Sequence, residues 1–383
     1  MKIIIDGTIY SSAPSGGAYR YFNELIPRLS KFPKTEVKIF AQKNHVGIPT
    51  GSNIKVAEDS LPTGSWLSEG KLKQFLRARK RELQSVMLRR QFSGFEEAVY
   101  HSTYYTPSPL NHITQVVTVH DMISELFKET YDLPHLKTLR KAKAECLKSA
   151  TRVIAISNQT KKDLQAIYHV PESKIDVVYH GVDYDFFSRI CSIEKKQQVL
   201  NELNLTTPYF LYVGGRLHHK NFKCFLKAFS QSKVSQDHKL AVAGAPWDEE
   251  EIDLIRKLNV EKHLIWMPTL GEHELPIVYQ NAIALGLPSH YEGFGLPLIE
   301  SMAAGCPVLA SNTGPFPELA EGAAVFFDPR DEAQMEKSFE RVLEDSVRTR
   351  LIELGKKQAM KFSWDLSAKK HWECYQKALK EHA

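Results

Sequence analysis

Short apolar runs alternate with amphipathic helical patterns along the 383-residue chain. Each run has the length of a buried strand, and the segment after it carries hydrophobic residues three or four positions apart. This alternation is typical of parallel sheets covered by helices, so the sequence predicts an α/β fold. The strands are expected at 2–6, 37–41, 98–101, 116–119, 152–156, 176–179, 209–213, 239–243, 264–267, 282–287, 307–310 and 323–327.

A hydrophilic stretch at 188–204 separates the first six predicted strands from the last six. Each half is long enough for a doubly wound sheet of its own, and a cleft between two such sheets is a common ligand site. A final helix is expected from residue 364, with apolar positions that include Leu366, Trp372, Tyr375 and Leu379. These positions would allow it to pack on the second domain.

The composition indicates a soluble globular protein, with 43% hydrophobic and 25% charged residues. No apolar segment approaches the ~20 residues of a membrane helix, and MKIIIDG leads into a strand rather than a secretory signal. Five scattered cysteines without a CxxC pair favour a reducing cytoplasm over a disulfide framework or a zinc site. The net charge of +5 suits an anionic ligand or a membrane surface and does not indicate nucleic acid.

The segment 290–304, HYEGFGLPLIESMAA, has the pattern of a turn from a strand into a helix. Gly293 and Gly295 allow the backbone to turn sharply and to approach a ligand, and Pro297 suits the first turn of a helix. The free N–H groups at such a helix start are a natural place for a phosphate. Glu292 precedes the turn and Glu300 follows it, and each is either solvent-facing or directed into a cleft.

The run EGFGLPLIE fits the E-x7-E signature of the retaining glycosyltransferases of family 4, and the chain resembles that family almost throughout. The resemblance implies the GT-B fold, in which two Rossmann-like doubly wound domains face each other across a cleft. The acceptor-side domain would comprise 1–187 and a final helix, 364–383, that crosses back to it. The nucleotide-sugar domain would comprise 188–363.

The segment 209–221, YFLYVGGRLHHKN, places Arg216 and Lys220 after a predicted strand. Arginine can grip two phosphate oxygens while lysine supplies a mobile point charge. A nucleoside diphosphate leaving group needs this combination, because negative charge accumulates on it as the glycosidic bond breaks. The alternative is two unpaired surface cations. The pattern G-G-R-x-x-x-K also resembles family 4.

Gly16 and Gly17 lie between the first strand and a helix, where they would let a phosphate approach the backbone or would simply form a turn. The dinucleotide fingerprint G-x-G-x-x-G is absent, which makes a Rossmann oxidoreductase a poor interpretation. Pro27 is expected to kink or shorten the following helix. His120 stands at the tip of the strand 116–119, as a structural hydrogen-bonding residue or a site residue.

The resemblance assigns roles to individual residues. It places His120 near the donor sugar or the acceptor, Glu292 at the sugar hydroxyls and Glu300 at the ribose hydroxyls. The backbone of Phe294, Gly295 and Leu296 would hold the sugar and diphosphate, and Thr269 and Leu270 would read the base through main-chain contacts.

The resemblance also implies retention by front-side attack, in which the departing phosphate helps to deprotonate the acceptor hydroxyl. Double displacement through a carboxylate is the alternative. Asp183 and Asp185 have a spacing that could bind a divalent ion, but Arg216 and Lys220 already supply the positive charge that a metal would provide. No metal and no cofactor are expected.

Residues 71–90, KLKQFLRARKRELQSVMLRR, form a basic amphipathic pattern. The segment would either lie on an anionic membrane at the inner face and bring the enzyme to a lipid-linked acceptor, or pack as an ordinary domain helix. We therefore expect a cytoplasmic enzyme that moves a hexose from UDP-glucose or a similar UDP-hexose to a saccharide or lipid-linked acceptor. GDP-mannose is the second donor. An epimerase or phosphorylase with the same fold, or a non-catalytic sugar-nucleotide-binding scaffold, remains as an alternative.

Overall fold

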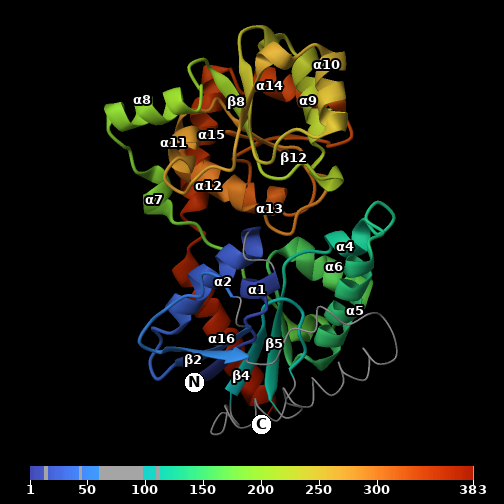
Figure 1. Cartoon of the computed structure of the whole chain (residues 1–383), viewed down its shortest axis with the longest axis vertical. Coiled ribbons are helices and arrows are strands. Elements are labelled where there is room, and N and C mark those ends of the chain that lie inside the picture. The colour runs from blue at the N-terminus through green and yellow to red at the C-terminus, as the bar shows by residue number, and fades with distance from the viewer. Residues whose placement is uncertain (13–15, 43–44, 60–97, 109–112, 383) are drawn as a thin grey trace. The chain divides into compact units, whose positions relative to one another are not determined.

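The computed structural model describes residues 1–12, 16–42, 45–59, 98–108 and 113–382. The chain divides into unit 1, which comprises Met1–Tyr179 and Trp364–Ala383, and unit 2, which comprises His180–Ser363 (Figure 1). Each unit is built on a parallel sheet with covering helices, which confirms the predicted fold class. No helix in the described ranges is long and apolar enough to cross a membrane. The basic segment 71–90 lies outside the described residues.

Unit 1 contains seven described strands in the order β3-β2-β1-β4-β5-β6-β7. The strands are β1 (Lys2–Ile5), β2 (Glu36–Gln42), β3 (Ile54–Asp59), β4 (Ala98–Ser102), β5 (Thr114–Val119), β6 (Arg152–Ala155) and β7 (Ile175–Val177). The helices are α1 (Ile9–Ser12), α2 (Gly16–Leu29), α4 (Ile123–Leu126), α5 (Pro134–Ser149), α6 (Asn158–Tyr168) and α16 (Trp364–His382). The helix α2 continues through Pro27 and ends two residues later, so the proline marks its last turn.

The strand β3 was not predicted from the sequence. It is one of the two edge strands of the described sheet, and its Val56 is 42% exposed. An edge strand pairs on one side alone and needs no continuous apolar run, so its hydrophobic pattern is weak. The strand is identified by its backbone pairing with β2, from Val37↔Ile54 onward.

The helix α16 belongs to unit 1, where it packs against α2, β4 and β5 (Figure 1). A chain of hydrogen bonds between buried groups secures it. The Tyr375 hydroxyl donates to His101 Nδ1 (2.5 Å), and His101 Nε2 donates to Thr118 Oγ1 (2.9 Å). Thr118 Oγ1 donates to the Tyr21 hydroxyl (3.0 Å), which in turn donates to His371 Nε2. The chain ends where His371 Nδ1 donates to the Ser367 carbonyl oxygen (2.7 Å).

The direction of this chain follows from its last acceptor. A carbonyl oxygen can only accept, so His371 Nδ1 carries the hydrogen, and in the neutral imidazole Nε2 then accepts from Tyr21. The same logic leaves His101 Nδ1 to accept from Tyr375. Both histidines are neutral because they are buried. Burial lowers the pKa of His371 to about 4 and holds that of His101 well below its usual range.

Unit 2 contains six strands in the order β10-β9-β8-β11-β12-β13. The strands are β8 (Tyr209–Val213), β9 (Lys239–Ala243), β10 (Leu264–Met267), β11 (Leu285–Leu287), β12 (Val308–Ser311) and β13 (Val325–Phe327). The helices are α7 (Tyr184–Ser188), α8 (Ile193–Glu202), α9 (Phe222–Gln231), α10 (Glu249–Leu258), α11 (Leu275–Asn281), α12 (Leu296–Ala304), α13 (Phe316–Ala320), α14 (Glu332–Arg341) and α15 (Asp345–Ala359). Every strand of this unit lies at a position that the hydrophobic pattern predicted.

The division between the units falls between Tyr179 and His180, eight residues before the expected boundary at 187. The short helix α7 explains the difference, because it packs against α12 of unit 2. The Gln280 side chain also donates to the Phe187 carbonyl oxygen at 2.8 Å. Residues 180–187 are thus held by unit 2, which the sequence pattern alone did not indicate.

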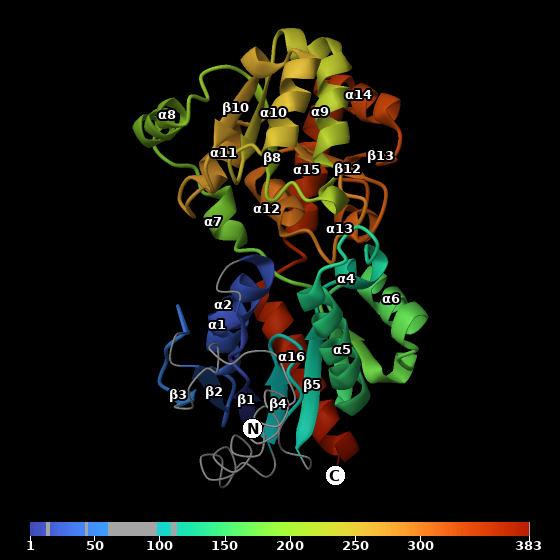
Figure 2. The ribbon, with the colours of Figure 1, turned by 45° about the vertical axis from the view of Figure 1, so that its right-hand side comes forward.

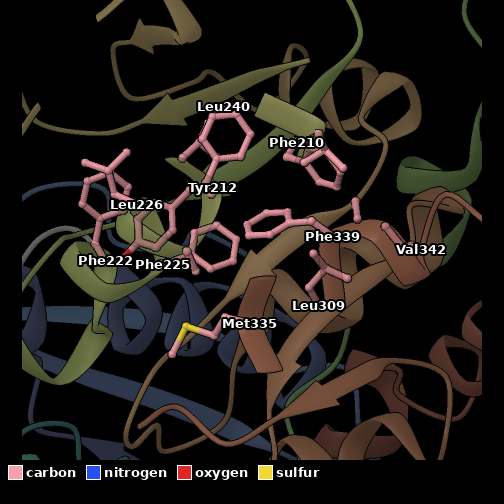
Figure 3. Close-up of a cluster of buried hydrophobic side chains, with 14 of the residues drawn as sticks. Phe210, Tyr212, Phe222, Phe225, Leu226, Leu240, Leu309, Met335, Phe339 and Val342 are labelled. Atoms are coloured by element: carbon pink, nitrogen blue, oxygen red, sulfur yellow. The ribbon is translucent and has the colours of Figure 1, made fainter. Parts of the chain in front are cut away.

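Side chains of the sheet and of helices α9, α10 and α14 form one hydrophobic core cluster of unit 2. Figure 2 shows the ribbon of these helices. Phe339 lies at the centre of this cluster, with ring centroids 5.0 Å from Phe210, 4.9 Å from Phe225 and 5.6 Å from Phe229 (Figure 3). Such close aromatic packing fixes α9 against β8. The loop between these two elements carries the predicted cations.

Candidate active site

The carboxyl ends of β8 and β11 meet at the centre of the unit 2 sheet. From β8 the chain continues to β9 and β10 on one side, and from β11 it continues to β12 and β13 on the other. The strand order therefore reverses between β8 and β11, which is where open α/β sheets bind ligands. The segment 214–220 follows β8 and the segment 288–296 follows β11, so the fold brings the two predicted motifs to one place.

Lys220 and Glu292 form an ion pair across this point. Lys220 Nζ lies 2.5 Å from Glu292 Oε1, and the Ser289 hydroxyl donates to the same oxygen at 2.8 Å. The two loops are also joined by their backbones, because the His290 N–H donates to the His219 carbonyl oxygen at 2.7 Å. Both charged side chains are partly accessible, at 29% and 12%. The pair is therefore held in place yet open to a ligand.

Arg216 is buried and paired, so its interpretation as an unpaired surface cation is wrong. Its guanidinium binds both carboxylate oxygens of Glu251, at 2.6 and 2.9 Å, and its side chain is only 6% exposed. Burial is the largest cause that raises the pKa of the Tyr212 phenol. The charges of Glu292, Arg216 and Glu251 also act on this pKa. Both ion pairs are therefore close enough to Tyr212 to influence its pKa.

Glu300 is buried in α12, at 3% exposure, so its interpretation as a solvent-facing residue is also wrong. The Tyr279 hydroxyl donates to Glu300 Oε2 at 3.3 Å. Phe294 is buried as well, with its ring 4.7 Å from that of His180. Thr269 and Leu270 follow β10, two strands away from β8, at the same edge of the sheet.

Asp183 has a structural role that the proposed metal spacing did not consider. Its side chain accepts from the Phe186 N–H at 3.0 Å and so caps the first turn of α7. One of the two carboxylates that the spacing singled out is therefore engaged by the backbone.

In unit 1, His120 directly follows β5, and its ring packs edge-on against Tyr21 at 5.2 Å. Burial lowers its pKa to about 4, so the imidazole is neutral at physiological pH. Tyr21 belongs to α2, whose first residues are the exposed Gly16 and Gly17. The end of β5 and the helix that begins at the glycine pair are therefore in contact through one tyrosine.

Two family models together match most of the chain. The model "Glycosyltransferase Family 4" matches residues 15–186, and the model "Glycosyl transferases group 1" matches residues 193–358. The chain belongs to the family 4 glycosyltransferases. It is therefore a glycosyltransferase that takes a sugar from a nucleotide sugar.

Known proteins similar to this glycosyltransferase include a relative of matching length. It is 27% identical over 380 residues to O-antigen chain mannosyltransferase B of Escherichia coli, with 95% of this chain and 97% of that protein covered. Among solved structures it resembles sucrose-phosphate synthase from Thermosynechococcus elongatus (TM-score 0.74, 19% identity, 98% of each chain). It also resembles HepE of Anabaena in complex with UDP and glucose (TM-score 0.72, 17% identity, 98% and 100% covered). These structures support the GT-B fold.

Sequence reasoning missed two residues that contact Arg216 at the candidate site of this glycosyltransferase, Glu251 and Trp247. The spacing of Asp248 and Glu251 is a capping box, and this signal could have placed the start of α10. It could not have shown that the same glutamate binds Arg216 in a loop 35 residues earlier. Such a contact depends on how β8 and β9 lie side by side.

Gly295 is required by the turn into α12 of the glycosyltransferase. It has φ +103°, and a Cβ at this position would lie 2.6 Å from the Phe316 ring. Gly295→Ala is expected to lower the free energy of unfolding by about 1–3 kcal/mol, because it adds backbone strain to a steric clash. Urea unfolding measures the loss. Gly215→Ala is the control, since its Cβ would meet no atom within 4 Å; an equal loss in both variants would contradict the explanation.

Proposed function

We propose that this glycosyltransferase moves mannose from GDP-mannose to a hydroxyl of a saccharide or lipid-linked acceptor, with retention of configuration and without a metal ion. The Lys220–Glu292 pair at the strand-order reversal carries the proposal, because it unites a cation for the leaving group with a carboxylate for the sugar. The full-length likeness to an O-antigen mannosyltransferase favours mannose. UDP-glucose, the donor first expected from the sequence, becomes the alternative.

The chemistry assigned to each residue follows from its donors and acceptors. Lys220 uses one N–H for Glu292, which leaves its others for phosphate oxygens. The described hydrogen bonds of Glu292 use Oε1, so we assign Oε2 to a sugar hydroxyl. The Leu296 N–H at the start of α12 would bind the diphosphate, since Pro297 has no N–H and the Leu298 N–H donates to the Gly295 carbonyl oxygen. Glu300 would receive the ribose. His120, neutral and at the end of β5, would serve the acceptor side.

Front-side attack needs no protein nucleophile, because the departing phosphate accepts the proton of the acceptor hydroxyl. The cations and the helix start would stabilise the negative charge on that phosphate. The enzyme would act in the cytoplasm, at the membrane where the acceptor is lipid-linked. The loop residues Thr269 and Leu270 would contact the base through their backbone.

A donor comparison tests this proposal. The enzyme is incubated with GDP-mannose or UDP-glucose, with and without mannoside acceptors, and with and without EDTA. We expect transfer from GDP-mannose only when acceptor is present, unchanged by EDTA, and an NMR coupling that shows the donor's anomeric configuration in the product. Faster use of UDP-glucose would overturn the donor assignment. Loss of transfer in EDTA would overturn metal independence, and donor conversion without acceptor would favour the epimerase or phosphorylase alternative.

A further inference from the structure

One edge of the Arg216 guanidinium has no partner in the part of the chain that the structure describes. Its Nε donates to Glu251 Oε1, and its Nη2 donates to Glu251 Oε2 and, at 2.8 Å, to the Pro246 carbonyl oxygen. Its Nη1 is buried and has no hydrogen-bond partner among the described residues. A buried donor left without an acceptor is costly. The arrangement therefore has a place for one more acceptor, supplied from outside the chain.

Two aromatic rings lie against the same guanidinium on one side, and they stack on each other with their centroids 5.8 Å apart. The guanidinium carbon lies 4.6 Å from the centre of the Trp247 ring and 5.8 Å from that of Phe222. Stacking fixes the plane of the group, and the Glu251 carboxylate fixes its rotation within that plane. The orientation of Nη1 is thus set by Glu251, Trp247 and Phe222.

The Nη1 edge lies at the carboxyl ends of β8 and β9. It is 3.5 Å from where a Cβ of Gly244 would stand, and Gly214 and Gly244 are the first residues after these two strands. A Cβ on Gly244 would also lie 2.8 Å from the Gly214 carbonyl oxygen. A glycine is therefore needed where the guanidinium reaches the ligand edge of the sheet.

Glu251 is itself held by the helix that carries it. Its Oε2 accepts from the Asp248 N–H at 3.0 Å, and its own N–H donates to Asp248 Oδ1 at 2.8 Å, which forms the capping box of α10. Its side chain is 4% exposed. Because this carboxylate is fixed to the start of α10, it also fixes the position of the Arg216 guanidinium that binds it.

We infer that Glu251 is a positioning residue, which holds Arg216 so that Nη1 donates to the diphosphate of the nucleotide sugar. The inference rests on the proposed nucleoside diphosphate donor and adds a residue that acts through Arg216. A free arginine side chain samples many rotamers, whereas this one is already in its binding orientation before the ligand arrives. Neutralising Glu251 has two opposed effects: it frees the arginine, and it raises the local positive charge. The positioning effect is the larger one.

The test measures nucleotide affinities by calorimetry in Glu251→Gln, with UDP, UMP, GDP and GMP as probes. Glutamine keeps the length of the side chain and can still complete a capping box, but it cannot offer two carboxylate oxygens to Arg216. We expect the affinity for the diphosphate that the wild type binds to fall about tenfold, the cost of releasing one long side chain. The affinity for the matching monophosphate should stay within about twofold.

Two further variants separate positioning from stability. Glu250 lies on the same helix as Glu251 and forms an exposed ion pair with Lys223 of α9, so Glu250→Gln should bind nucleotides like the wild type. In an Arg216→Met background, Glu251→Gln should cause no further loss of diphosphate affinity. Tighter diphosphate binding by Glu251→Gln, or an equal loss for mono- and diphosphates with a lower Tm, would overturn the inference. A wild-type chain that binds neither UDP nor GDP would refute the proposed function itself.

Discussion

Lys220→Ala is expected to lower kcat for sugar transfer by about 10²–10³-fold, the usual effect of losing one preorganised charge-stabilising donor. Lys220 stands at the strand-order reversal of unit 2, 2.5 Å from Glu292. In the proposed reaction it meets negative charge that grows as the glycosidic bond breaks. Its loss should therefore affect the transition state more than the bound donor, so kcat should fall more than KM rises.

A matched control for this variant is Lys223→Ala. Lys223 lies three residues further along and forms an exposed ion pair with Glu250, a kind of contact that contributes little. Steady-state kinetics should give kcat near the wild-type value for Lys223→Ala. If both variants lost activity to the same degree, or if Lys220→Ala kept kcat within about threefold, Lys220 would not act on the leaving group.

Unit 1 is expected to lose stability steeply as the pH falls below 6.5, the ordinary histidine value. His101, His120 and His371 have lowered pKa values because they are buried, with those of His120 and His371 at about 4. Between pH 6.5 and 4 the unfolded chain binds protons at these histidines and the folded chain does not. The free energy of unfolding should therefore fall by about 1.4 kcal/mol per pH unit for each histidine.

Over the range from pH 6.5 to 5 this is about 2 kcal/mol for each histidine. Urea unfolding followed by pulsed hydrogen exchange at β4 and β5 measures the change in unit 1. The buried Asp6 has the opposite effect on stability. Desolvation raises its pKa in the folded state, so as the pH falls the folded chain binds this proton before the unfolded chain does. His371→Gln isolates the effect of one histidine. It should reduce the slope of the free energy of unfolding against pH by the amount that corresponds to one proton. An unchanged slope would show that His371 is already charged in the folded chain.

The hydrophobic pattern of the sequence predicted the strands well where both faces of the sheet are covered. All six strands of unit 2 and most of those in unit 1 lie where apolar runs stand. The pattern failed at β3, which pairs on one side alone among the described strands, and at the unit boundary, where α7 is held by contacts with α12. Local patterns record burial, whereas these two features depend on which elements become neighbours.

The candidate site was predicted in part for the same reason. Motifs at the ends of strands identified the loops that carry Lys220 and Glu292, and a parallel sheet places such loops at one edge. The partners of the charges could not be predicted. The Arg216–Glu251 pair joins the ends of two adjacent strands, and the burial of Glu300 depends on Tyr279 in the preceding helix.

The position of α16 in the chain has a consequence for synthesis. A nascent chain leaves the ribosome from its N-terminus, so α16 emerges only after the whole of unit 2, although its partners His101 and Thr118 were made long before. Until then the sheet of unit 1 lacks the helix that covers it. Unit 2 is continuous in sequence and depends on no later segment, so the second unit to be translated should be the first to complete its fold.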